Sequence, residues 1–247
     1  MRHFGLIGRT LGHSFSAKFF NSKFAAEQID ADYLLFELES IDELPKLLAT
    51  MPLEGFNVTI PYKQSVMRYL DEITPEAREV GAVNCVEFSD GKLIGHNTDV
   101  RGIEASLHWL DIENCKRALI LGTGGASKAV QHVLRTQGIE YKCVSRSSER
   151  GDITYDELTP EIIAQHTLII NATPVGMHPD VAQAPDINYE HIGPEHRVFD
   201  LVYNPANTEF LRRAKERGAM TMGGMLMLQT QAIASWHVWR KAEEHTK

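Results

Sequence analysis

Residues 117–127 read RALILGTGGAS, and this stretch decides the fold class of the chain. Residues 118–121 form a continuous apolar run, which is typical of a strand buried on both faces of a parallel sheet. The glycine loop at 122–127 follows directly and opens a helical pattern that ends at Gly138. Such a loop is where open α/β sheets bind a dinucleotide pyrophosphate at a helix N-terminus. The stretch therefore predicts a Rossmann-like, doubly wound parallel sheet.

The glycine loop is specific only in this context. Gly122 permits a tight turn, Gly124 lets the backbone approach a phosphate, and the small Ser127 allows the helix to pack on the strand. Alone, such a string is equally a plain tight turn. The strand before it, the helix after it and a second strand at 141–145 favour dinucleotide binding.

The end of that second strand indicates which dinucleotide. NAD-binding sheets usually place an acid there to hold the ribose 2′-hydroxyl. Here residues 145–150 read SRSSER, without an acid at the strand end. Arg146 and Arg150 suit a 2′-phosphate because guanidinium groups form bidentate, charge-assisted hydrogen bonds to it. A solvated loop with two chance arginines is the plainer alternative, but the pattern favours NADP.

Around the glycine loop, strands alternate with helices, which implies a parallel sheet with helical crossovers. We expect further strands at 167–173 and 197–203, and helices at 100–110, 157–165, 207–218 and 224–244. The sequence thus predicts an NADP-binding domain over residues 99–221. The terminal helix, within residues 222–247, is expected to pack between the domains or onto the first one.

The first part of the chain predicts a second α/β domain over residues 1–98, joined by the terminal helix. We expect strands at 3–8, 33–38 and 55–61, helices at 16–29, 41–51 and 62–71, and a hairpin within 81–99. Asp90-Gly91 provides the turn signal of that hairpin. The fold class is therefore α/β with two α/β domains, and clefts at domain junctions are common ligand sites.

The serines after the first strand allow three interpretations. GHSFS at residues 12–16 resembles a nucleophile elbow, which would make Ser14 a hydrolase nucleophile, but Ser16 replaces the second glycine. Alternatively, the hydroxyls of Ser14 and Ser16 bind a carboxylate at the helix end. In the third interpretation they only cap the helix. Sequence position does not separate the last two.

Two further polar clusters lie at strand ends. Residues 57–63 read NVTIPYK and place polar groups at the carboxyl end of a strand, where open α/β sheets bind ligands. Residues 97–99 read NTD at the expected domain junction. Taken alone, Lys63 is equally a surface lysine, and Asp99 is equally a helix cap.

Composition excludes several classes of protein. The 247 residues carry 25 Lys and Arg against 33 Asp and Glu, for a formal net charge of −8. This balance disfavours nucleic-acid and anionic membrane surfaces. No apolar run approaches the roughly 18 residues of a membrane span. We therefore expect a cytoplasmic protein, monomer or homodimer, that acts on a small molecule without nucleic-acid or membrane partners.

Neither the cysteines nor the histidines predict a metal site. The three cysteines stand alone, without a CxxC pair, and the 11 histidines form no HExxH motif. A disulfide framework is not expected for the same reason.

Taken together, the motifs resemble the shikimate dehydrogenase family. They are FGLIG with HSFS near the start, NVTIPYK at 57–63, GAVNC at 81–85, HNTDVRG at 96–102, GTGGAS at 122–127, SRSSER at 145–150, NATPVGM at 171–177, DLVYNP at 200–205 and GGMLMLQTQA at 223–232. They keep the family order over nearly the whole chain, and NVTIPYK with NTDVRG is more specific than the glycine loop.

The resemblance implies NADPH-dependent reduction of 3-dehydroshikimate to shikimate, in aromatic amino-acid biosynthesis, with the active site in the interdomain cleft. It implies catalysis by Lys63 and Asp99. The implied substrate-binding residues are Ser14, Ser16, Thr59, Asn84, Tyr203 and Gln229. The implied NADP-binding residues are Gly122, Thr123, Gly124, Gly125, Ala126, Ser145, Arg146, Ser147, Arg150, Thr173 and Leu201.

The chain departs from the family pattern at few positions. Ala17 stands where the family usually has proline, and Phe20-Asn21 replaces a His-Asn pair. Ser145-Arg146-Ser147 replaces Asn-Arg-Thr, with the arginine retained. Met222 stands where a glycine is often found before the last helix.

Two other functions remain open at this stage. One is a quinate/shikimate dehydrogenase that uses NAD, which the charge at residues 145–150 disfavours. The other is a non-catalytic NADP-binding sensor, which would need neither Lys63 nor Asp99.

Overall fold

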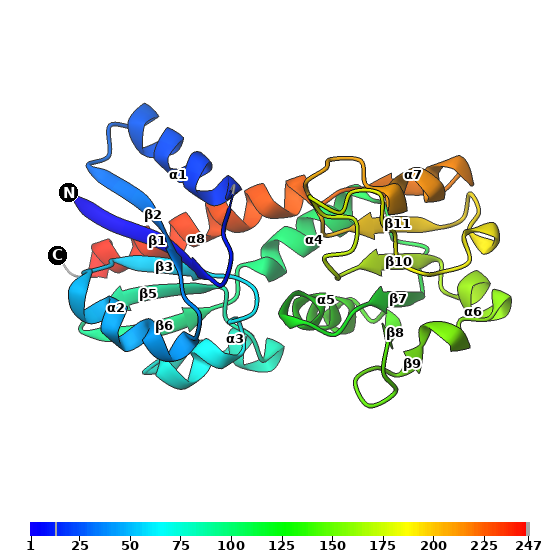
Figure 1. The fold of residues 1–247 in the computed structure, drawn as a ribbon, viewed down its shortest axis with the longest axis horizontal. Helices are drawn as coiled ribbons and strands as arrows, with labels where there is room; N and C mark the ends of the chain where they lie inside the picture. Colours follow the sequence, from blue (N-terminus) through cyan, green and yellow to red (C-terminus); the bar gives the residue numbers. More distant parts are fainter. Residues whose placement is uncertain (13, 246–247) are drawn as a thin grey trace. The chain divides into compact units, whose positions relative to one another are not determined.

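The computed structural model describes residues 1–12 and 14–245, with side chains as far as Arg240 in the last helix. His13 of the expected serine loop and residues 246–247 of the expected terminal segment lie outside the described residues. The chain divides into two compact units, residues 1–98 with 232–247 and residues 99–231. Each unit contains a six-stranded sheet (Figure 1).

The second unit contains the Rossmann-like sheet. Its strands are β7 (Arg117–Leu121), β8 (Glu140–Ser145), β9 (Ile153–Thr154), β10 (Leu168–Asn171), β11 (Arg197–Asp200) and β12 (Met220–Met222). The order is β12-β11-β10-β7-β8-β9, and all neighbours are parallel. This is the doubly wound order, and it reverses between β7 and β10. The predicted fold class is confirmed here.

The helices of this unit cover the sheet. They are α4 (Asp99–Trp109), α5 (Gly125–Thr136), α6 (Pro160–Gln165), α7 (Glu209–Glu216) and the start of α8 (Met225–His245). α5 packs on β7 and β8, and α7 packs on β11 and β12. α4 and α8 approach closely at Gly102, where a Cβ would lie 2.5 Å from the carbonyl oxygen of Met227. Only glycine allows that spacing.

The first unit contains a mixed sheet. Its strands are β1 (Arg2–Gly8), β2 (Ala31–Glu37), β3 (Gly55–Val58), β4 (Glu72–Ile73), β5 (Cys85–Ser89) and β6 (Lys92–His96), and its helices are α1 (Phe15–Ala26), α2 (Leu44–Thr50), α3 (Pro75–Val80) and the end of α8. The strand order is β2-β1-β3-β5-β6-β4. β1 lies parallel to β2 and β3, whereas β5 lies antiparallel to β3 and β6.

The predicted hairpin is confirmed. β5 and β6 pair through a turn at Asp90 and Gly91, whose φ angles are 50° and 75°. Two positive φ angles in succession match the twist of a two-residue hairpin, and Asp-Gly tolerates them best.

The end of α8 completes the core of the first unit. Trp239 is 1% exposed, stacks on Phe4 with ring centroids 4.8 Å apart, and donates its indole N–H to the Val86 carbonyl oxygen at 3.0 Å. Gly55 makes room for it, because a Cβ there would lie 2.3 Å from the indole nitrogen. Aromatic stacking therefore fixes α8 against the sheet.

Several helical segments differ from the sequence prediction. Residues 62–71 form only the 3₁₀ helix Ser65–Tyr69, because the Lys63 carbonyl accepts from Val83 N at 2.7 Å instead of continuing a helix. The segment 157–165 shortens to α6, because Pro160 opens that helix and disfavours helical geometry before it. Segment 41–51 likewise splits into the 3₁₀ helix Ile41–Glu43 and α2, with Pro45 in the first turn of α2.

Sequence patterns did not reveal α3 or the short strands β4, β9 and β12. These strands have two or three residues, too few for a visible alternation of side chains. α3 had a readable signal, since the Thr74 hydroxyl accepts from Ala77 N and Pro75 occupies the first turn.

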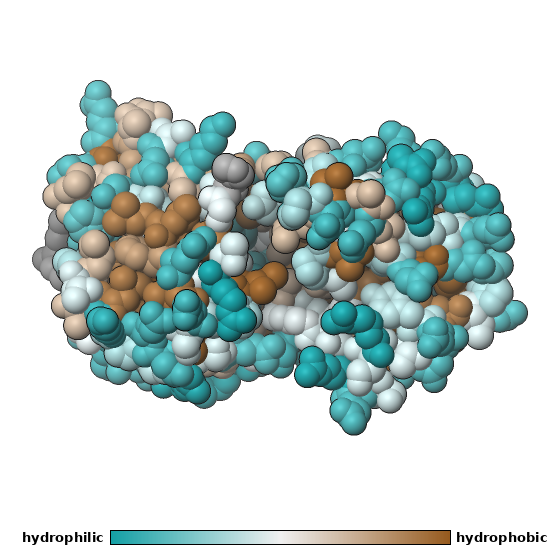
Figure 2. All heavy atoms as spheres, viewed as in Figure 1, coloured by the Kyte–Doolittle hydropathy of each residue, from teal (hydrophilic) through white to brown (hydrophobic). Residues whose placement is uncertain are grey.

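The surfaces of the two units differ in the view of Figure 2. Hydrophilic residues dominate the visible face of the second unit, whereas the visible face of the first unit shows a patch of hydrophobic residues. Among the described residues, no helix has the length and apolar character needed to cross a bilayer.

Candidate active site

Ser14 and Ser16 lie where β1 leads into α1. Ser14 occupies the N-cap position of α1 but makes no capping hydrogen bond with its side chain. Ser16 is 8% exposed, and its hydroxyl lies beside that of Tyr33. Capping is therefore not what occupies the Ser14 hydroxyl, and helix-terminal N–H groups lie close to it. The Ser14 hydroxyl and these N–H groups can therefore bind a carboxylate.

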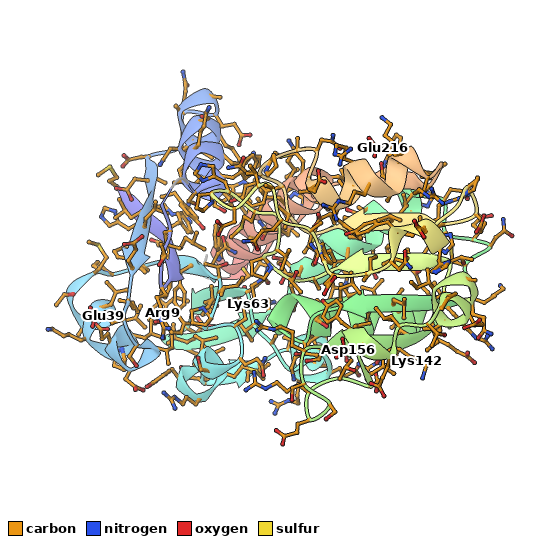
Figure 3. All side chains as sticks on the ribbon, turned by 45° about the vertical axis from the view of Figure 1, so that its right-hand side comes forward. Arg9, Glu39, Lys63, Lys142, Asp156 and Glu216 are labelled. Atoms are coloured by element: carbon orange, nitrogen blue, oxygen red, sulfur yellow. The ribbon has the colours of Figure 1, made fainter. Side chains whose placement is uncertain are left out.

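Thr59 and Lys63 follow β3, beside the end of β1. Thr59 N donates to the Ile7 carbonyl oxygen at 2.9 Å, and its methyl group packs on Gly8. The backbone of Lys63 is fixed by the bond from Val83 N, and its half-buried side chain is labelled in Figure 3. Parallel pairing of β1 and β3 thus brings the two predicted loops to one edge of the sheet.

Asn84 is held in a defined orientation. Its side chain is 2% exposed, and its Oδ1 accepts from the backbone N–H of Thr98 at 2.6 Å. Because an N–H only donates, Oδ1 must face Thr98, and the Nδ2 end is assigned by elimination. Asp99, the first residue of α4, is 3% exposed.

The glycine loop connects β7 to α5. Gly122 has φ +109°, and a Cβ there would lie 2.8 Å from the methyl group of Thr173, so the structure brings these two predicted residues together. Gly124 is the N-cap of α5, and a Cβ added to it would meet no atom within 4 Å, so its backbone is open to approach. Thr123, Gly125 and Ala126 lie beside it.

The predicted phosphate loop follows β8. Ser145 is 8% exposed and accepts from Ser147 N at 3.3 Å, which forms a tight turn. Ser147 in turn accepts from Glu149 N at 3.3 Å. Arg146 and Arg150 are exposed. Both guanidinium groups can therefore reach a solvent-facing phosphate.

Thr173 and Leu201 follow β10 and β11. A polar cluster joins the two loops, and we name it the Asp200 network: the buried Asn171, Asp200 and Thr208, with the half-buried Thr173. Asn171 Oδ1 accepts from Thr173 N at 3.0 Å, and Asn171 Nδ2 donates to Asp200 Oδ1 at 2.9 Å. Asp200 also accepts from Val202 N at 3.0 Å. Burial raises the pKa of Asp200 to about 6, although these hydrogen bonds oppose the rise.

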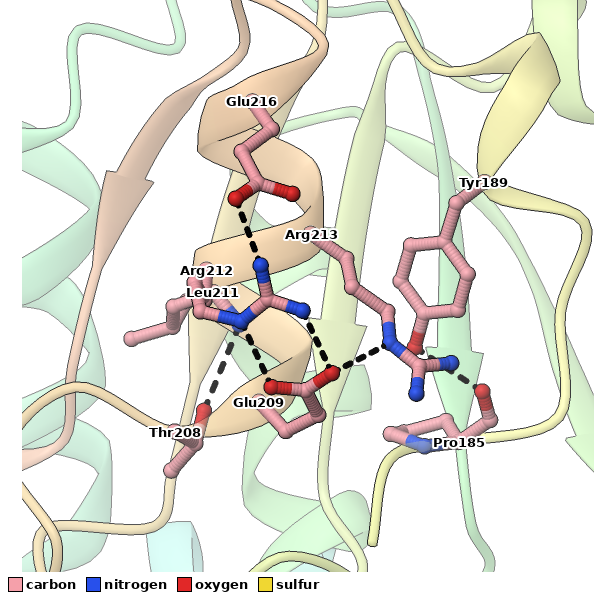
Figure 4. A network of polar contacts seen from close by, with 8 residues as sticks. All are labelled: Pro185, Tyr189, Thr208, Glu209, Leu211, Arg212, Arg213 and Glu216. Carbon is pink, nitrogen blue, oxygen red and sulfur yellow. Dashed lines mark hydrogen bonds and ion pairs between the residues drawn. The ribbon is translucent and has the colours of Figure 1, made fainter. Parts of the chain in front are cut away.

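The Asp200 network is anchored on α7. Thr208 donates to Asp200 Oδ2 at 2.6 Å. It also caps α7 by accepting from Leu211 N at 3.4 Å, as Figure 4 shows. In the same view, Glu209 accepts from Arg212 and Arg213 at 2.7 Å. One threonine therefore links the helix to the two loops that carry Thr173 and Leu201.

Tyr203 and the glutamines come from the last part of this unit. Tyr203 is half-buried after β11. On α8, Gln229 is exposed, whereas Gln231 is 8% exposed. Gln229 lies two helical turns before Trp236, so helical periodicity alone would place it on the same buried face. The sequence therefore did not distinguish the exposed glutamine from the buried one.

The structure shows polar residues that sequence patterns did not single out. Tyr33, Asn57, Ser235 and Asp200 are each at most 4% exposed and hydrogen-bonded through their side chains. Asn57 and Asp200 carried a signal, because each stands at or near the end of a strand in a quoted motif. Tyr33 and Ser235 carried none, since tyrosine and serine are ordinary in a strand and a helix.

Comparison with known proteins identifies the family. The family model "Shikimate dehydrogenase substrate binding domain" matches residues 6–86. A shikimate dehydrogenase (NADP(+)) from Clostridium beijerinckii is 39% identical over 260 residues, covering 100% of this chain and 95% of its relative. One from Carboxydothermus hydrogenoformans is 36% identical over 252 residues, covering 95% and 90%.

Solved structures agree with these sequences. Shikimate 5-dehydrogenase from Thermus thermophilus, solved in complex with NADP(H) and shikimate, is 31% identical with a TM-score of 0.86, covering 97% of this chain and 93% of that one. A shikimate dehydrogenase from Peptoclostridium difficile is 37% identical with the same TM-score, covering 98% and 92%. This chain belongs to the shikimate dehydrogenase family.

Proposed function

We propose that this protein catalyses the NADPH-dependent, reversible reduction of 3-dehydroshikimate to shikimate. The observation that carries the proposal is similarity over the full length of the chain to relatives named shikimate dehydrogenase (NADP(+)). The glycine loop at the reversal of a doubly wound sheet supports it independently, because that is where such sheets bind dinucleotides.

NADP would be held by the second unit. Gly122 to Ala126 would bind the pyrophosphate at the N-terminus of α5, through backbone N–H groups. Arg146 and Arg150, with Ser145 and Ser147, would bind the 2′-phosphate. Thr173 and Leu201 would line the nicotinamide. The open Cβ position at Gly124 and the exposed guanidinium groups fit these roles.

The substrate would be held mainly by the first unit. Ser14 and Ser16 would donate to its carboxylate, with help from Tyr203. Thr59, Asn84 and Gln229 would bind the ring hydroxyls. Carboxylate binding is supported by the Ser14 hydroxyl, which makes no capping hydrogen bond. Binding of a ring hydroxyl is supported by the fixed side-chain amide of Asn84. The exposure of Gln229 makes the buried Gln231 a second glutamine to test beside it.

Lys63 and Asp99 would perform the proton chemistry. NADPH, when bound, supplies a hydride to the carbonyl carbon of the ring. Negative charge then develops on the carbonyl oxygen, and a protonated Lys63 can donate a hydrogen bond and then its proton to that oxygen. Asp99 would orient the ammonium group and favour its charged form. Binding and orientation by the remaining residues would lower the barrier further.

An absorbance assay of NADP reduction tests this function. The purified chain should oxidise shikimate with NADP faster than it oxidises quinate, and faster than it uses NAD. Faster turnover of quinate with NAD would favour the quinate/shikimate alternative. Binding of NADP in calorimetry without turnover of either compound would favour a sensor and contradict the proposal.

A further inference from the structure

Residues of α1 fix both the ring and the backbone of Tyr33, which lies on β2. Its ring is 2% exposed and stacks on Phe20 with centroids 4.6 Å apart and an interplanar angle of 13°. Asn21 clamps its backbone, donating to the Tyr33 carbonyl at 3.0 Å and accepting from its N–H at 2.9 Å. Phe20, which stands where the family usually has histidine, and Asn21 therefore hold this tyrosine in place. The position of its hydroxyl is correspondingly fixed.

The hydroxyl of Tyr33 has a defined hydrogen-bond acceptor. The hydroxyl donates to Asn57 Oδ1 at 2.8 Å. Asn57 cannot turn its amide around, because its Nδ2 donates to the Asn84 carbonyl oxygen at 3.0 Å and to Ser235 Oγ at 2.9 Å. The Tyr33 oxygen therefore keeps a lone pair that can accept a hydrogen bond from the neighbouring hydroxyl of Ser16.

Ionisation does not disturb this arrangement. Burial raises the pKa of Tyr33 well above its ordinary value of 10.0, and the neighbouring Cys85 adds to the rise. Tyr33 thus keeps its proton throughout the working range of an enzyme, and its donor role does not change with pH.

The chain of bonds continues to the amide of Asn84. Ser235 Oγ lies 3.1 Å from Thr98 Oγ1, and either oxygen can donate. Thr98 in turn bonds to Asn84 through its hydroxyl at 3.0 Å and through its backbone N–H. We name Tyr33, Asn57, Asn84, Thr98 and Ser235 the Tyr33 network. It connects Ser16 with both the carbonyl oxygen and the side chain of Asn84.

We propose that Tyr33 is a positioning residue for the substrate, which sets the spacing between Ser16 at one end of the substrate ring and Asn84 at the other. The inference rests on the proposed function, in which these two residues bind the carboxylate and a ring hydroxyl. Every member of the network is buried and neutral, so its bonds are short-ranged, directional and cooperative. Preorganised groups of this kind lower the cost of ordering the site when ligand binds.

The test removes a single oxygen. In Tyr33→Phe the ring can keep its stack on Phe20, while Ser16 loses its acceptor and Asn57 loses its donor. We expect KM for shikimate to rise about tenfold, the usual effect of one lost hydrogen bond at a positioned group. KM for NADP should stay within about twofold, because the network lies in the first unit and the proposed NADP-binding residues lie in the second.

Tyr62→Phe is the matched control. Tyr62 is 4% exposed in the same unit, and its hydroxyl donates to the Leu38 carbonyl oxygen at 2.6 Å, outside the network. It should lose comparable stability on thermal unfolding but leave KM for shikimate unchanged. Equal KM values for the two variants would mean that Tyr33 is merely structural and would overturn the inference.

A double-mutant cycle adds a readout that a structural role does not move. The KM effects of Tyr33→Phe and Ser16→Ala should be strongly non-additive, whereas those of Tyr33→Phe and Ser14→Ala should add. Additivity in both pairs would contradict the proposal. If Tyr33→Phe fails to fold, Ser235→Ala interrupts the same network, and an unchanged KM for shikimate there would also contradict it. If the wild-type protein does not oxidise shikimate at all, that result refutes the proposed function instead.

Discussion

The two units hold the loops that we propose to bind ligands in place with largely buried polar networks of opposite character. In the first unit the Tyr33 network contains only neutral hydroxyl and amide groups. In the second unit the Asp200 network is built around a carboxylate that is 0% exposed and accepts three hydrogen bonds. The Asp200 network connects the ends of the neighbouring strands β10 and β11, whereas the Tyr33 network connects β2, β3 and α8, with β1 between the two strands.

The difference lies in what pH can change. A neutral network has no group that titrates near neutrality, so the loops that we propose to bind substrate should keep their geometry at any working pH. The carboxylate of Asp200 has a pKa of about 6, so the loops that carry Thr173 and Leu201 depend on a group that changes its protonation state in that range. Substitutions in each unit can break or sharpen this contrast.

The largest effect is expected at Lys63 in the first unit and Asp99 in the second. Lys63→Ala should lower kcat about 10²- to 10⁴-fold, because a proton donor acts in the transition state. Asp99→Asn should lower kcat too, and the double variant should be barely worse than the poorer single variant. Shikimate-dependent NADP reduction measures all three, with folding checked by circular dichroism. Strictly additive losses of kcat would mean that the two residues make independent contacts. Lys46→Ala, which removes an exposed lysine, is the control and should leave kcat unchanged.

A smaller effect is expected at the cofactor alone. Arg146→Ala should raise KM for NADP about tenfold or more and leave KM for NAD nearly unchanged, because a charge-assisted hydrogen bond to phosphate is worth about 1.5–3 kcal/mol. Steady-state kinetics with both cofactors measure the split. Lys142→Ala removes the same charge from an exposed position on β8 and should change neither value (Figure 3). Equal effects of Arg146→Ala on both cofactors would contradict the assignment.

Asp200→Asn should change how the stability of the protein depends on pH. Because the native pKa of about 6 exceeds the ordinary 3.8, the folded protein retains a proton that the unfolded chain has released. The stability that this group contributes is therefore present below about pH 4 and lost as pH rises through 6, roughly 3 kcal/mol in all.

Urea unfolding at several pH values measures this loss. Relative to wild type, Asp200→Asn should gain stability as pH rises across that window. The exposed Asp156→Asn serves as the control for removal of an acid from the same unit (Figure 3). A wild-type minus variant difference that stays constant with pH would show that Asp200 does not titrate there. Tyr33→Phe should show no such pH dependence relative to wild type.

The smallest effect is expected at Ser14. Because its hydroxyl makes no capping bond, Ser14→Ala should hardly change stability but should raise KM for shikimate several-fold. Adding Ser16→Ala should weaken shikimate binding further. Thr159 gives the contrast, because it caps α6 by accepting from Ile162 N. Thr159→Ala should lose about 1 kcal/mol of unfolding free energy and leave KM for shikimate unchanged. A destabilised Ser14→Ala with normal KM would support capping.

The sequence by itself determined the fold class and most of the elements. Apolar runs such as residues 118–121 have to be buried on both faces, and the glycine loop after them needs a backbone that only glycine permits. The serines at the start of α1 and the arginines after β8 were also readable, because helix ends and strand ends expose groups of predictable chemistry. These features are local, so short stretches of sequence specify them.

Only the tertiary structure decided which polar side chains meet. Tyr33 and Ser235 lie near opposite ends of the chain, yet both bond to Asn57, and no spacing rule connects a strand with a distant helix. Asp200 belongs to the DLVYNP motif, but its pKa depends on burial, which raises it, and on hydrogen bonds from Asn171 and Thr208, which lower it. The sheet register brings Asn171 to Asp200, and the start of α7 brings Thr208. Hydrogen bonds and desolvation depend on distances of a few ångströms, and those distances are set by packing between elements.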